Sequence, residues 1–577
     1  MRRKLKLSPR LVFLRDRKGV FEADESDAGN MSDLGGALQQ KYDYIIVGAG
    51  SAGCVLANRL SQDRSLSVLL IESGPPDSSP LIAMPRGIGK LLAAGNPHVW
   101  DYQVAPRIGL APELWLKGRA LGGSSSINGM VYVRGTPADY DNWEALGCTG
   151  WGWQHVGPQF VALEDHELGA SEWRGVGGPL KVSVHPPGNP LCEAVLNAAV
   201  QAGTPRAADI NDVNTVMQGG MGYQPVTTFK GKRYSAARAF LAPIRNRTNL
   251  EVLTGTDALR IEFENRRATG VSVRGHEGTR TIAVTGELIL AAGAIESPKL
   301  LQLSGIGPGE LLQSFGIPVL IDAPAVGTNL REHRYLALQY RVTGGSLNNR
   351  LSGIGLLRSM LDYALRSKGP LTHSAHEVGG FVKTRPELDR PDAQIGVGLY
   401  SMSGSGQAVN IDTQPGITIG GYFMRPQSQG TIRIQSPDPA ARPYIDANHL
   451  SADIDIKSAI SLYRWIRRLA AQPALQPWLV SATTPGTEFQ TDEQIIDAFL
   501  RFGNTAYHVC GTVRMGSDSA AALDPQLRLR GIENVRVADT SIMPTIVSGN
   551  TNAPAMVIGL RAAELILAAR VTAARAA

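Results

Sequence analysis

A buried strand that runs directly into a glycine-rich turn and a helix is the feature that most limits the possible folds of this chain. The run Tyr44–Val47 is apolar and rich in β-branched residues, as a buried strand requires, and the sequence GAGSAG follows it. In such a turn Gly48 permits a tight bend, Gly50 lets the backbone approach a pyrophosphate, and Gly53 lets the helix pack on the strand. The helix N-terminus then faces the phosphates with its amides and the positive end of its dipole.

An acidic residue at the end of the next strand supports this interpretation. The strand-like sequence SVLLIESG contains Glu72, which lies 24 residues after Gly48. An acid at this offset accepts hydrogen bonds from a ribose diol and disfavours a 2′-phosphate. The sequence therefore predicts that an adenine dinucleotide is bound, and at this point NAD and FAD both remain open.

A second glycine cluster favours FAD. The sequence GRALGGSSSINGMVYVRG, residues 118–135, holds seven closely spaced small residues: Gly122 to Ser126, with Gly118 and Gly129. A loop with so little side-chain bulk can lie flat against a ligand and offer it backbone N–H groups. A simple nicotinamide dehydrogenase does not need such a loop, whereas the long, rigid FAD molecule does.

A third segment predicts another turn from a strand to a helix near the cofactor. In ELILAAGAIESPKLLQLSGIGP, residues 287–308, a buried strand runs into Ala-Ala-Gly-Ala. We expect the helix to begin near Ser297 and Pro298, because proline suits the first turn of a helix.

Charge and apolar runs argue against nucleic-acid and membrane-spanning proteins. Of the net charge of +6, residues 1–30 supply +3, and the rest of the chain has no basic patch interleaved with aromatic residues. No apolar run reaches the ~18 residues that cross a bilayer. The basic start of the chain has too short an apolar core for a signal peptide, so we expect residues 1–40 to be a disordered tail.

The four cysteines indicate neither disulfides nor a structural metal. They are Cys54, Cys148, Cys192 and Cys510, and no two of them form a CxxC pair. That pattern gives no zinc site and no disulfide framework, so we expect no metal and a reducing, cytoplasmic location.

Four segments together resemble the glucose–methanol–choline (GMC) flavin oxidoreductases. The glycine–serine segment at 118–135 follows the family's first signature, and GAIESPKLLQLSGIG at 293–307 its second. The segments HVCGTVRMG at 508–516 and VADTSIMPTIVSGNTNAP at 537–554 resemble its two C-terminal signatures. The matches occur in the family's order over nearly the whole folded chain, from residue 42 to about 567.

The resemblance implies an α/β fold with two interleaved parts. Residues 41–155, 225–315 and 505–570 would form a doubly wound, Rossmann-like FAD-binding domain. Residues 156–224 and 316–504 would form an α+β substrate domain that contains an antiparallel sheet. Strand-like runs such as GITIGGYF and a helical apolar spacing from Ile456 to Leu469 are compatible with the second part.

The resemblance also assigns a cofactor site and its mode of binding. Matched residue by residue, the FAD site would comprise Gly48, Gly50, Ser51, Ala52, Gly53, Glu72, Gly122, Gly123, Ser124, Asn128, Gly129, Val252, Ala292, Asp539, Asn552 and Pro554. The last helix would point its N-terminus toward the flavin and stabilise the reduced, anionic form. Some relatives carry a histidine that bonds covalently to the flavin, whereas this chain has Ser126 and Ile127 there, so we expect non-covalent FAD.

The catalytic roles implied by the resemblance fall on His508 and Asn550. The family's histidine at this position takes the alcohol proton, and a histidine pKa of about 6.5 suits that task. Asn550 would contact the substrate oxygen, with Asn552 as the alternative second residue. We expect the other nine histidines to be packed or surface residues, and Cys510 to be a packing residue, since a reactive thiol needs a lowered pKa and a dedicated base.

The substrate is the least constrained part of the prediction. Tyr422, Met424 and Tyr507 are candidates for the pocket wall, and Glu377 is the one acid that could hold a quaternary amine. We therefore expect oxidation of a primary alcohol, aromatic or aliphatic, to the aldehyde. The hydride would go to flavin N5, and O₂ or a quinone or other carrier would accept the electrons.

Three alternatives remain open. Hydroxynitrile lyases share the architecture and also use a histidine at this site. Light-driven fatty-acid decarboxylases resemble the family too, but their motif has no histidine at the position of His508 and a cysteine near that of Met424. The third alternative is a non-catalytic flavoprotein.

Overall fold

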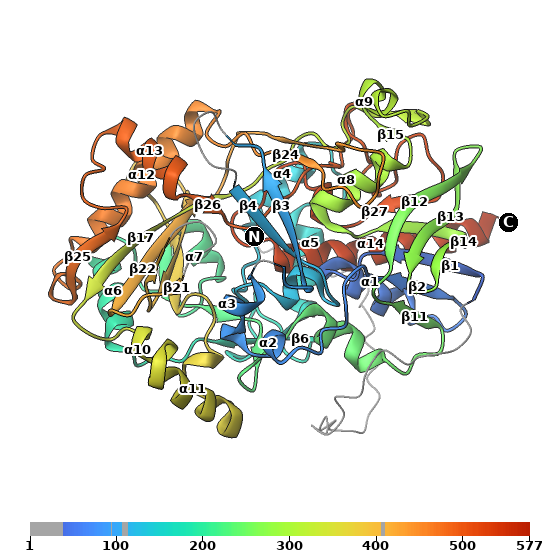
Figure 1. The fold of residues 1–577 in the computed structure, drawn as a ribbon. Coiled ribbons are helices and arrows are strands. Elements are labelled where there is room, and N and C mark those ends of the chain that lie inside the picture. The colour runs from blue at the N-terminus through green and yellow to red at the C-terminus, as the bar shows by residue number, and fades with distance from the viewer. Residues whose placement is uncertain (1–38, 94, 107–112, 405–409, 577) are drawn as a thin grey trace, which may run out of the picture.

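Two large β-sheets organise the chain (Figure 1). The computed structural model describes residues 39–93, 95–106, 113–404 and 410–576. The predicted disordered tail, residues 1–40, lies outside the described residues except for its last two positions.

The first sheet has a parallel centre. Five parallel strands lie in the order β11 (Leu250–Leu253), β2 (Val68–Ile71), β1 (Lys41–Val47), β14 (Gly278–Leu290) and β27 (Val535–Val537). The first half of β14 also pairs with an antiparallel hairpin made of β12 (Asp257–Glu264) and β13 (Arg267–Gly275). The strands β1, β2 and β14 end in almost continuous apolar, fully buried runs, as parallel strands covered on both faces do. This arrangement confirms the predicted α/β fold.

Three helices begin at the carboxyl edge of this sheet. They are α1 (Ser51–Leu60), α8 (Gly293–Leu303) and α14 (Asn552–Ala576), and α14 packs along α1. The predicted start of α8 near Ser297 was wrong by about one turn, because Pro298 lies inside the helix. Proline cannot bond to the carbonyl of Ala294, and the hydroxyl of Thr512 donates to that carbonyl instead, at 2.7 Å.

The second sheet is antiparallel. Its order is β25 (Leu479–Thr484), β17 (Arg334–Val342), β22 (Gly416–Phe423), β19 (Ala393–Gly398), β18 (Val378–Val382) and β7 (Gly220–Tyr223), and the short β26 (Asn504–Thr505) pairs with the start of β17. On one face Leu338 and Ile419 pack in a core with Trp465 of α12 (Asp453–Ala470). The other face carries Tyr422, Gln394 and Tyr335.

The two sheets have separate apolar cores. The core of the parallel sheet includes Phe160 of α5 (Trp153–Leu163) and Leu180 of β6 (Leu180–Val184). The core of the antiparallel sheet includes Leu191 and Val195 of α6 (Pro190–Gln201). Helix α5 and strand β6 thus pack with the parallel sheet, whereas helix α6 packs with the antiparallel sheet. The predicted division of the chain at residues 156 and 224 stays a prediction.

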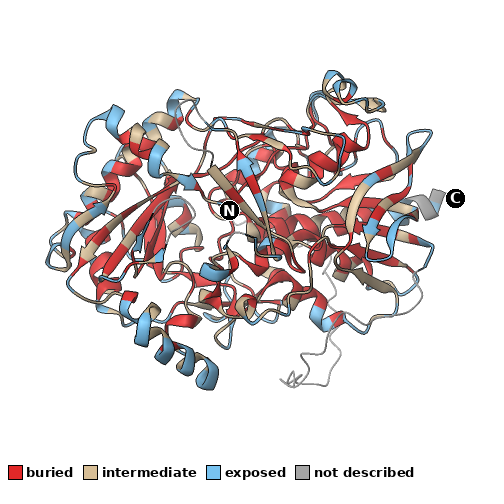
Figure 2. Cartoon of the chain, viewed as in Figure 1, coloured by how far each residue is buried: buried red, intermediate tan, exposed pale blue. Residues whose placement is uncertain are grey.

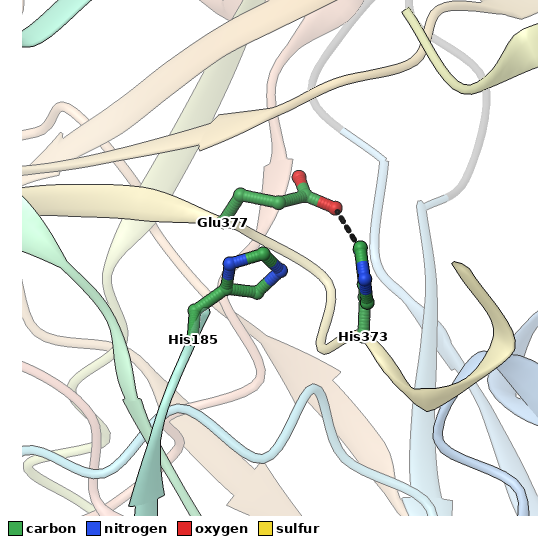
Figure 3. Close-up of side chains that lie close together, drawn as sticks. All are labelled: His185, His373 and Glu377. Atoms are coloured by element: carbon green, nitrogen blue, oxygen red, sulfur yellow. Dashed lines mark hydrogen bonds and ion pairs between the residues drawn. The ribbon is translucent and has the colours of Figure 1, made fainter. Parts of the chain in front are cut away.

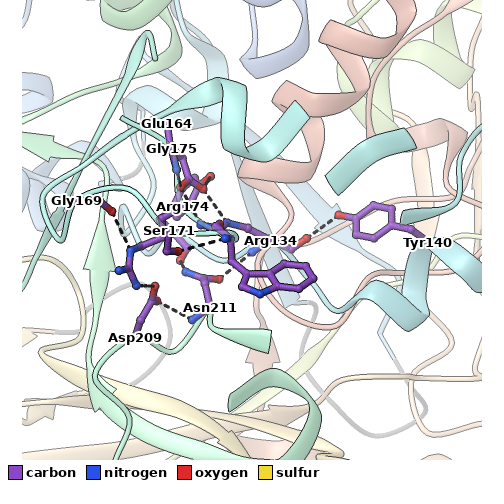
Figure 4. A network of polar contacts seen from close by, with 11 residues as sticks. Arg134, Tyr140, Glu164, Gly169, Ser171, Arg174, Gly175, Asp209 and Asn211 are labelled. Atoms are coloured by element: carbon purple, nitrogen blue, oxygen red, sulfur yellow. Dashed lines mark hydrogen bonds and ion pairs between the residues drawn. The ribbon is translucent and has the colours of Figure 1, made fainter. Parts of the chain in front are cut away.

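A buried ion pair anchors the segment that follows the glycine–serine loop (Figure 4). Arg134 donates from Nε and Nη2 to the two carboxylate oxygens of Glu164, at 2.7 and 2.8 Å, and both side chains are almost fully buried. The side chain of Asn211 accepts from the backbone N–H of Arg134, and the hydroxyl of Tyr140 donates to the backbone carbonyl of Arg134. These contacts hold the loop's exit against residues up to 77 positions away in the sequence.

The remaining helices and strands are short or lie at the periphery. They include β3 (Val99–Val104), β4 (Glu113–Gly118), α4 (Pro137–Ala145), β5 (Glu164–His166), β8 (Pro225–Val226), α9 (Gly309–Ser314), β23 (Thr431–Arg433), β24 (Tyr444–Asp446) and α13 (Asp492–Phe502). Among the described residues, no helix combines the length and the apolar character that crossing a bilayer requires.

Candidate active site

Predicted cofactor residues gather at the carboxyl edge of the parallel sheet. Gly48 directly follows β1, Glu72 follows β2, Val252 lies in the last half of β11, Ala292 follows β14 and Asp539 follows β27. In open α/β sheets, ligands bind in the crevice outside the carboxyl ends of the strands.

The glycines of the first turn differ in what surrounds them. A Cβ atom on Gly53 would lie 1.9 Å from the carbonyl oxygen of Gly48, so the protein's own packing requires a glycine there. A Cβ atom on Gly50 would meet only the oxygen of Ala291, at 3.9 Å. Since no protein atom explains Gly50, its lack of a side chain fits the close approach of a dinucleotide phosphate.

The glycine–serine loop lies on this turn. The N–H of Gly122 donates to the carbonyl of Ala49 at 2.8 Å, and a Cβ on Gly123 would lie 2.7 Å from the Cα of Gly50. The side chain of Asn128 accepts from Arg233, a buried residue that also donates to the carbonyls of Ser125 and Asn128. Gly122 and Gly123 thus lie against the first turn, whereas Arg233 fixes the later part of the loop with Asn128, and Gly129 lies next to Ala375; Ser124 belongs to the same loop.

The N-termini of α1 and α14 meet at the same edge. Their first residues are in contact, because Ser51 Oγ donates to Asn552 Oδ1 at 2.7 Å. Pro554 lies in the first turn of α14, where a missing N–H costs no helical hydrogen bond. Two helix N-termini with their positive dipole ends side by side favour an anionic ligand.

Two buried acids brace this edge. Glu72 accepts from the N–H groups of Ala49 and Gly74 at 3.0 and 2.9 Å, and burial raises its pKa to about 7 despite these bonds. Asp539 accepts from Gly293 N–H and Ser297 Oγ at 2.9 and 2.6 Å, which ties β27 to the start of α8. A carboxylate has about four acceptor positions, so Glu72 can still accept a bond from a ribose hydroxyl.

The structure brings His508 and Asn550 together. Asn550 Nδ2 lies 3.0 Å from His508 Nε2, although 42 residues separate them in the sequence. Two further residues extend the contact: Gln394 Nε2 donates to Asn550 Oδ1 at 3.0 Å, and Tyr422 donates its hydroxyl to Gln394 Oε1 at 2.5 Å. Gln394 had no sequence signal that marked it, because only the pairing of β19 with β22 places it opposite Tyr422.

A second histidine determines the tautomer of His508. His333 Nε2 lies 2.9 Å from the carbonyl oxygen of Met424 and must donate to it. In the neutral imidazole its Nδ1 then accepts, and the atom 3.0 Å away is His508 Nδ1. His508 therefore carries its proton on Nδ1, which leaves a lone pair on Nε2, the atom beside Asn550. His333, predicted to be a packing or surface residue, is buried, and its contact with His508 also makes it part of the site.

A bulge positions His508. Thr505 pairs with Arg334 and Cys510 with Arg331, so four residues of one strand oppose two of the other. Tyr507, with a φ of 64°, absorbs the extra length in a left-handed conformation that is unfavourable for a tyrosine.

The carboxylate of Glu332 fills this bulge. It accepts from the backbone N–H groups of His508 and His333, at 2.9 and 2.8 Å, and from the hydroxyl of Thr505. Burial raises its pKa to about 7, and the positive charge of Lys117 opposes that rise. Sequence inspection missed Glu332, although it is adjacent to His333 in the chain.

The site is buried and weakly basic. Burial, and to a smaller extent His333 and Lys117, lowers the pKa of His508 well below its usual value, so the imidazole is neutral at physiological pH. Burial likewise lowers the pKa of His333 to about 3. Cys510 is fully buried and its pKa is raised by burial, which keeps the thiol protonated.

The start of helix α4 holds the loop that carries Asn550. Ser548 donates its N–H and its hydroxyl to the two oxygens of Asp139, both at 2.8 Å, at the start of α4. Gly549 has a φ of 114°, and a Cβ there would lie 2.5 Å from a methyl carbon of Val133. Only glycine permits this backbone, so the sequence SGN fixes where Asn550 points.

The three predicted pocket residues have different surroundings. Tyr422 stacks on the ring of His333, with centroids 4.4 Å apart, and contacts the edge of His508. The side chain of Met424 is fully buried in a small apolar cluster, and its carbonyl, which accepts from His333, is what it offers the site. Tyr507 is partly exposed, and its carbonyl accepts from Lys117 at 2.8 Å.

Additional aromatic groups cover the same sheet face. His376 Nε2 lies 3.4 Å from the hydroxyl of Tyr335, and the two rings lie over Gly396 and Gly420 of neighbouring strands. Side chains larger than hydrogen at either glycine would strike these rings. The face that carries Tyr422 and Gln394 is thus lined by aromatic and imidazole groups.

A second polar cluster lies beside this face (Figure 3). The ligand-type atoms of His185, His373 and Glu377 all lie within 4.8 Å of one another, and His373 Nδ1 is 3.3 Å from the Glu377 carboxylate. The same carboxylate forms a buried ion pair with Arg86, which lowers its pKa to about 2 despite burial. Because the guanidinium already neutralises the one acid, the donor set is poorly suited to a cation, and the absence of a metal stays a prediction.

The carboxyl edge of the parallel sheet, the glycine–serine loop and the buried His508–Asn550 pair together are typical of an FAD-dependent oxidoreductase that acts on CH–OH donors. Residues 42–335 match the N-terminal part of the GMC oxidoreductase family and residues 426–559 its C-terminal part, and the chain belongs to this family.

Relatives that align over nearly their whole length support this membership. An alcohol dehydrogenase [acceptor] from Pseudomonas putida is 39% identical over 540 residues, which cover 91% of this chain and 96% of the relative. The mitochondrial choline dehydrogenase of Homo sapiens is 38% identical over 95% of this chain and 94% of its own. The crystal structure of pyridoxine 4-oxidase from Mesorbium loti superposes with a TM-score of 0.80 at 31% identity, over 91% of this chain and 98% of that one.

Proposed function

We propose that the protein oxidises a primary alcohol, aromatic or aliphatic, to the aldehyde, with His508 as the proton acceptor. The observation that carries the proposal is the tautomer of His508: the contact with His333 leaves the lone pair on Nε2, beside Asn550 in a buried site. A neutral imidazole with its lone pair on a defined nitrogen is the state that a general base needs, and the substrate hydroxyl would take the place of Asn550 at Nε2.

Asn550 is the second polar group that we assign to the substrate. Its amide is held from one side by Gln394 and lies against His508 Nε2. An amide neither titrates nor carries charge, so it can orient the substrate oxygen at any working pH.

FAD is the cofactor, and we propose that it is bound non-covalently. Gly50, the N-termini of α1 and α14, and Glu72 would hold its diphosphate and ribose. Bound FAD supplies the hydride acceptor at N5. The hydroxyl of Ser126 donates to the carbonyl of Leu121, and Ile127 packs on Ile82, so both side chains at the positions of possible attachment are committed to the protein.

The surroundings favour a neutral alcohol over choline. The pairing of Glu377 with Arg86 leaves it without a net negative charge to offer a quaternary amine. Tyr335, His376 and Tyr422 instead present apolar ring surfaces that suit an aryl or alkyl chain. Two of the relatives above are named for alcohol and pyridoxine and one for choline, so this preference rests on the surroundings of Glu377 and not on the relatives' names.

The test is anaerobic flavin reduction across a panel of primary alcohols, followed by exposure to air. We expect benzylic or medium-chain alcohols to bleach the flavin and choline to do so at least tenfold more slowly. Fast reoxidation in air identifies an oxidase, whereas slow reoxidation with rapid turnover on a quinone identifies a dehydrogenase. A flavin that stays oxidised with every alcohol while the protein cleaves a cyanohydrin would refute the proposal in favour of a lyase.

A further inference from the structure

One helix of the protein carries an exposed apolar stripe. Helix α11 (Gly353–Arg366) projects from the lower edge of the antiparallel half in Figure 1, and Figure 2 shows most of its surface exposed. Five large apolar side chains lie on its outer surface with 48% to 79% of their area exposed: Ile354, Leu357, Met360, Leu361 and Leu365. Their spacing of three or four residues places them along one side of the helix.

The side of α11 that faces the protein is mixed, with Ser359 fully buried and Leu356 and Tyr363 half-buried. Its one fully buried residue is Ser359, whose hydroxyl donates to the carbonyl of Arg350 at 2.8 Å. Arg350 in turn forms an ion pair with Asp362 at 3.0 Å. A surface helix normally packs most of its large apolar side chains inward, whereas α11 leaves five of its six large aliphatic side chains exposed; its ion pair with Arg350 is exposed as well.

Basic residues lie beside the apolar stripe. Arg358, Arg366 and Lys368 are all exposed on α11 or just after it, and the segment 353–368 contains one acid, Asp362, which is turned toward Arg350. An apolar stripe with Lys and Arg at its borders is the pattern of helices that lie in the interface of an anionic bilayer. At 14 residues the helix is roughly 21 Å long, enough to lie flat in the headgroup region.

We propose that α11 docks the protein on the surface of an anionic lipid bilayer, with Leu357, Leu361 and Leu365 inserted among the acyl chains. A second copy of the chain fits this surface less well. One helix face offers a few hundred Å² of apolar area, below the ~800 Å² per partner of a stable dimer, and the basic borders of two copies would repel each other.

The experiment is co-sedimentation of the full-length holoenzyme with vesicles of phosphatidylcholine alone or with about 30% phosphatidylglycerol. We expect binding to the anionic vesicles that is at least tenfold stronger than to neutral ones and that weakens as salt is added. The triple variant Leu357→Gln, Leu361→Gln, Leu365→Gln should lower the partition coefficient at least tenfold. The variant Arg358→Gln, Arg366→Gln, Lys368→Gln should abolish the preference for anionic lipid.

Matched controls separate docking from general stickiness. The variant Leu146→Gln, Leu168→Gln, Val480→Gln removes three exposed apolar side chains elsewhere and should bind vesicles as the unmodified protein does. The proposal fails if the unmodified protein binds neither vesicle at low salt, or if the leucine variant binds as well as its control. It also fails if α11 instead mediates a dimer, seen as a concentration-dependent mass that only the leucine variant loses. Vesicle binding requires no turnover, so this result is independent of the proposed alcohol oxidation.

Discussion

Nδ1 of His333 lies 3.0 Å from Nδ1 of His508, and this contact determines which nitrogen of the proposed base carries the proton and which carries the lone pair. His333→Phe would keep the ring stacked on Tyr422 but remove the acceptor. We expect the rate of flavin reduction to fall at least tenfold, because His508 can then adopt the wrong tautomer. The acid limb of the pH profile should also move to higher pH, since His333 lowers the pKa of His508.

His333→Gln is the matched control, because an amide can accept from His508 and donate to Met424. Stopped-flow reduction should show most of the rate restored in this variant. Equal losses in the Phe and Gln variants would mean that His333 acts only through packing.

His508 and Cys510 should respond very differently to substitution. His508→Ala is expected to lower the rate constant for flavin reduction by about 10²–10⁴, the usual contribution of a general base. Cys510→Ser should stay within a few-fold of the unmodified enzyme, since burial keeps the thiol protonated and unreactive. If the serine variant loses as much activity as the alanine variant, the assignment of roles is wrong.

The pH dependence follows from the lowered pKa of His508. A base whose pKa is depressed stays neutral, and therefore active, as the pH falls past the usual histidine value of about 6.5. We expect kcat/KM for the best alcohol to be flat from about pH 8 to about pH 6 and to decline only at lower pH. An acid limb at 6.5 or above that disappears in His508→Gln would contradict the effect of burial.

Gly50 and Gly53 should separate cofactor binding from folding. Gly50→Ala places its Cβ in contact with no protein atom closer than 3.9 Å, and the φ of −76° suits alanine. We expect the apo-protein to unfold at an unchanged temperature but to bind FAD at least tenfold more weakly, as titration of the apo-protein would measure. Gly53→Ala should instead lower the unfolding temperature itself, because its Cβ would overlap the carbonyl of Gly48. Unchanged FAD affinity in Gly50→Ala would place the diphosphate elsewhere.

The ion pair of Arg134 and Glu164 gives a prediction for stability. Glu164→Gln leaves a buried guanidinium without its counter-charge, which costs about 3–5 kcal/mol of the free energy of unfolding. Urea denaturation of the holoenzyme measures the loss. The control is Glu193→Gln, which breaks an exposed pair with Arg206 and should cost less than about 1 kcal/mol. Similar small losses in both variants would show that Arg134 is rescued by its other acceptors.

Local patterns in the sequence were sufficient to predict the first strand, glycine turn and helix, and the resemblance of four segments to a known family supplied the α/β fold and the candidates His508 and Asn550. The strand, glycine turn and helix from Tyr44 onward form a continuous segment whose structure depends on near neighbours. His333, Glu332 and Gln394 could not be predicted in this way, because their places depend on the bulge opposite β17 and on the register of β19 with β22. The spacing from Ile354 to Leu365 would predict a core-facing helix, and only the tertiary structure reveals that the apolar side faces outward.

The five hydrogen bonds around His508 all run in one direction, from the Tyr422 hydroxyl through Gln394, Asn550, His508 and His333 to the Met424 carbonyl. In the resting enzyme the Nε2 lone pair that would accept the substrate proton therefore already accepts a hydrogen bond from the amide of Asn550. An incoming alcohol must displace an internal competitor before it can react. Part of the alcohol's binding energy is used to displace Asn550. In Asn550→Ala we therefore expect the alcohol to bind more tightly, while its reacting oxygen is oriented less well and reacts more slowly.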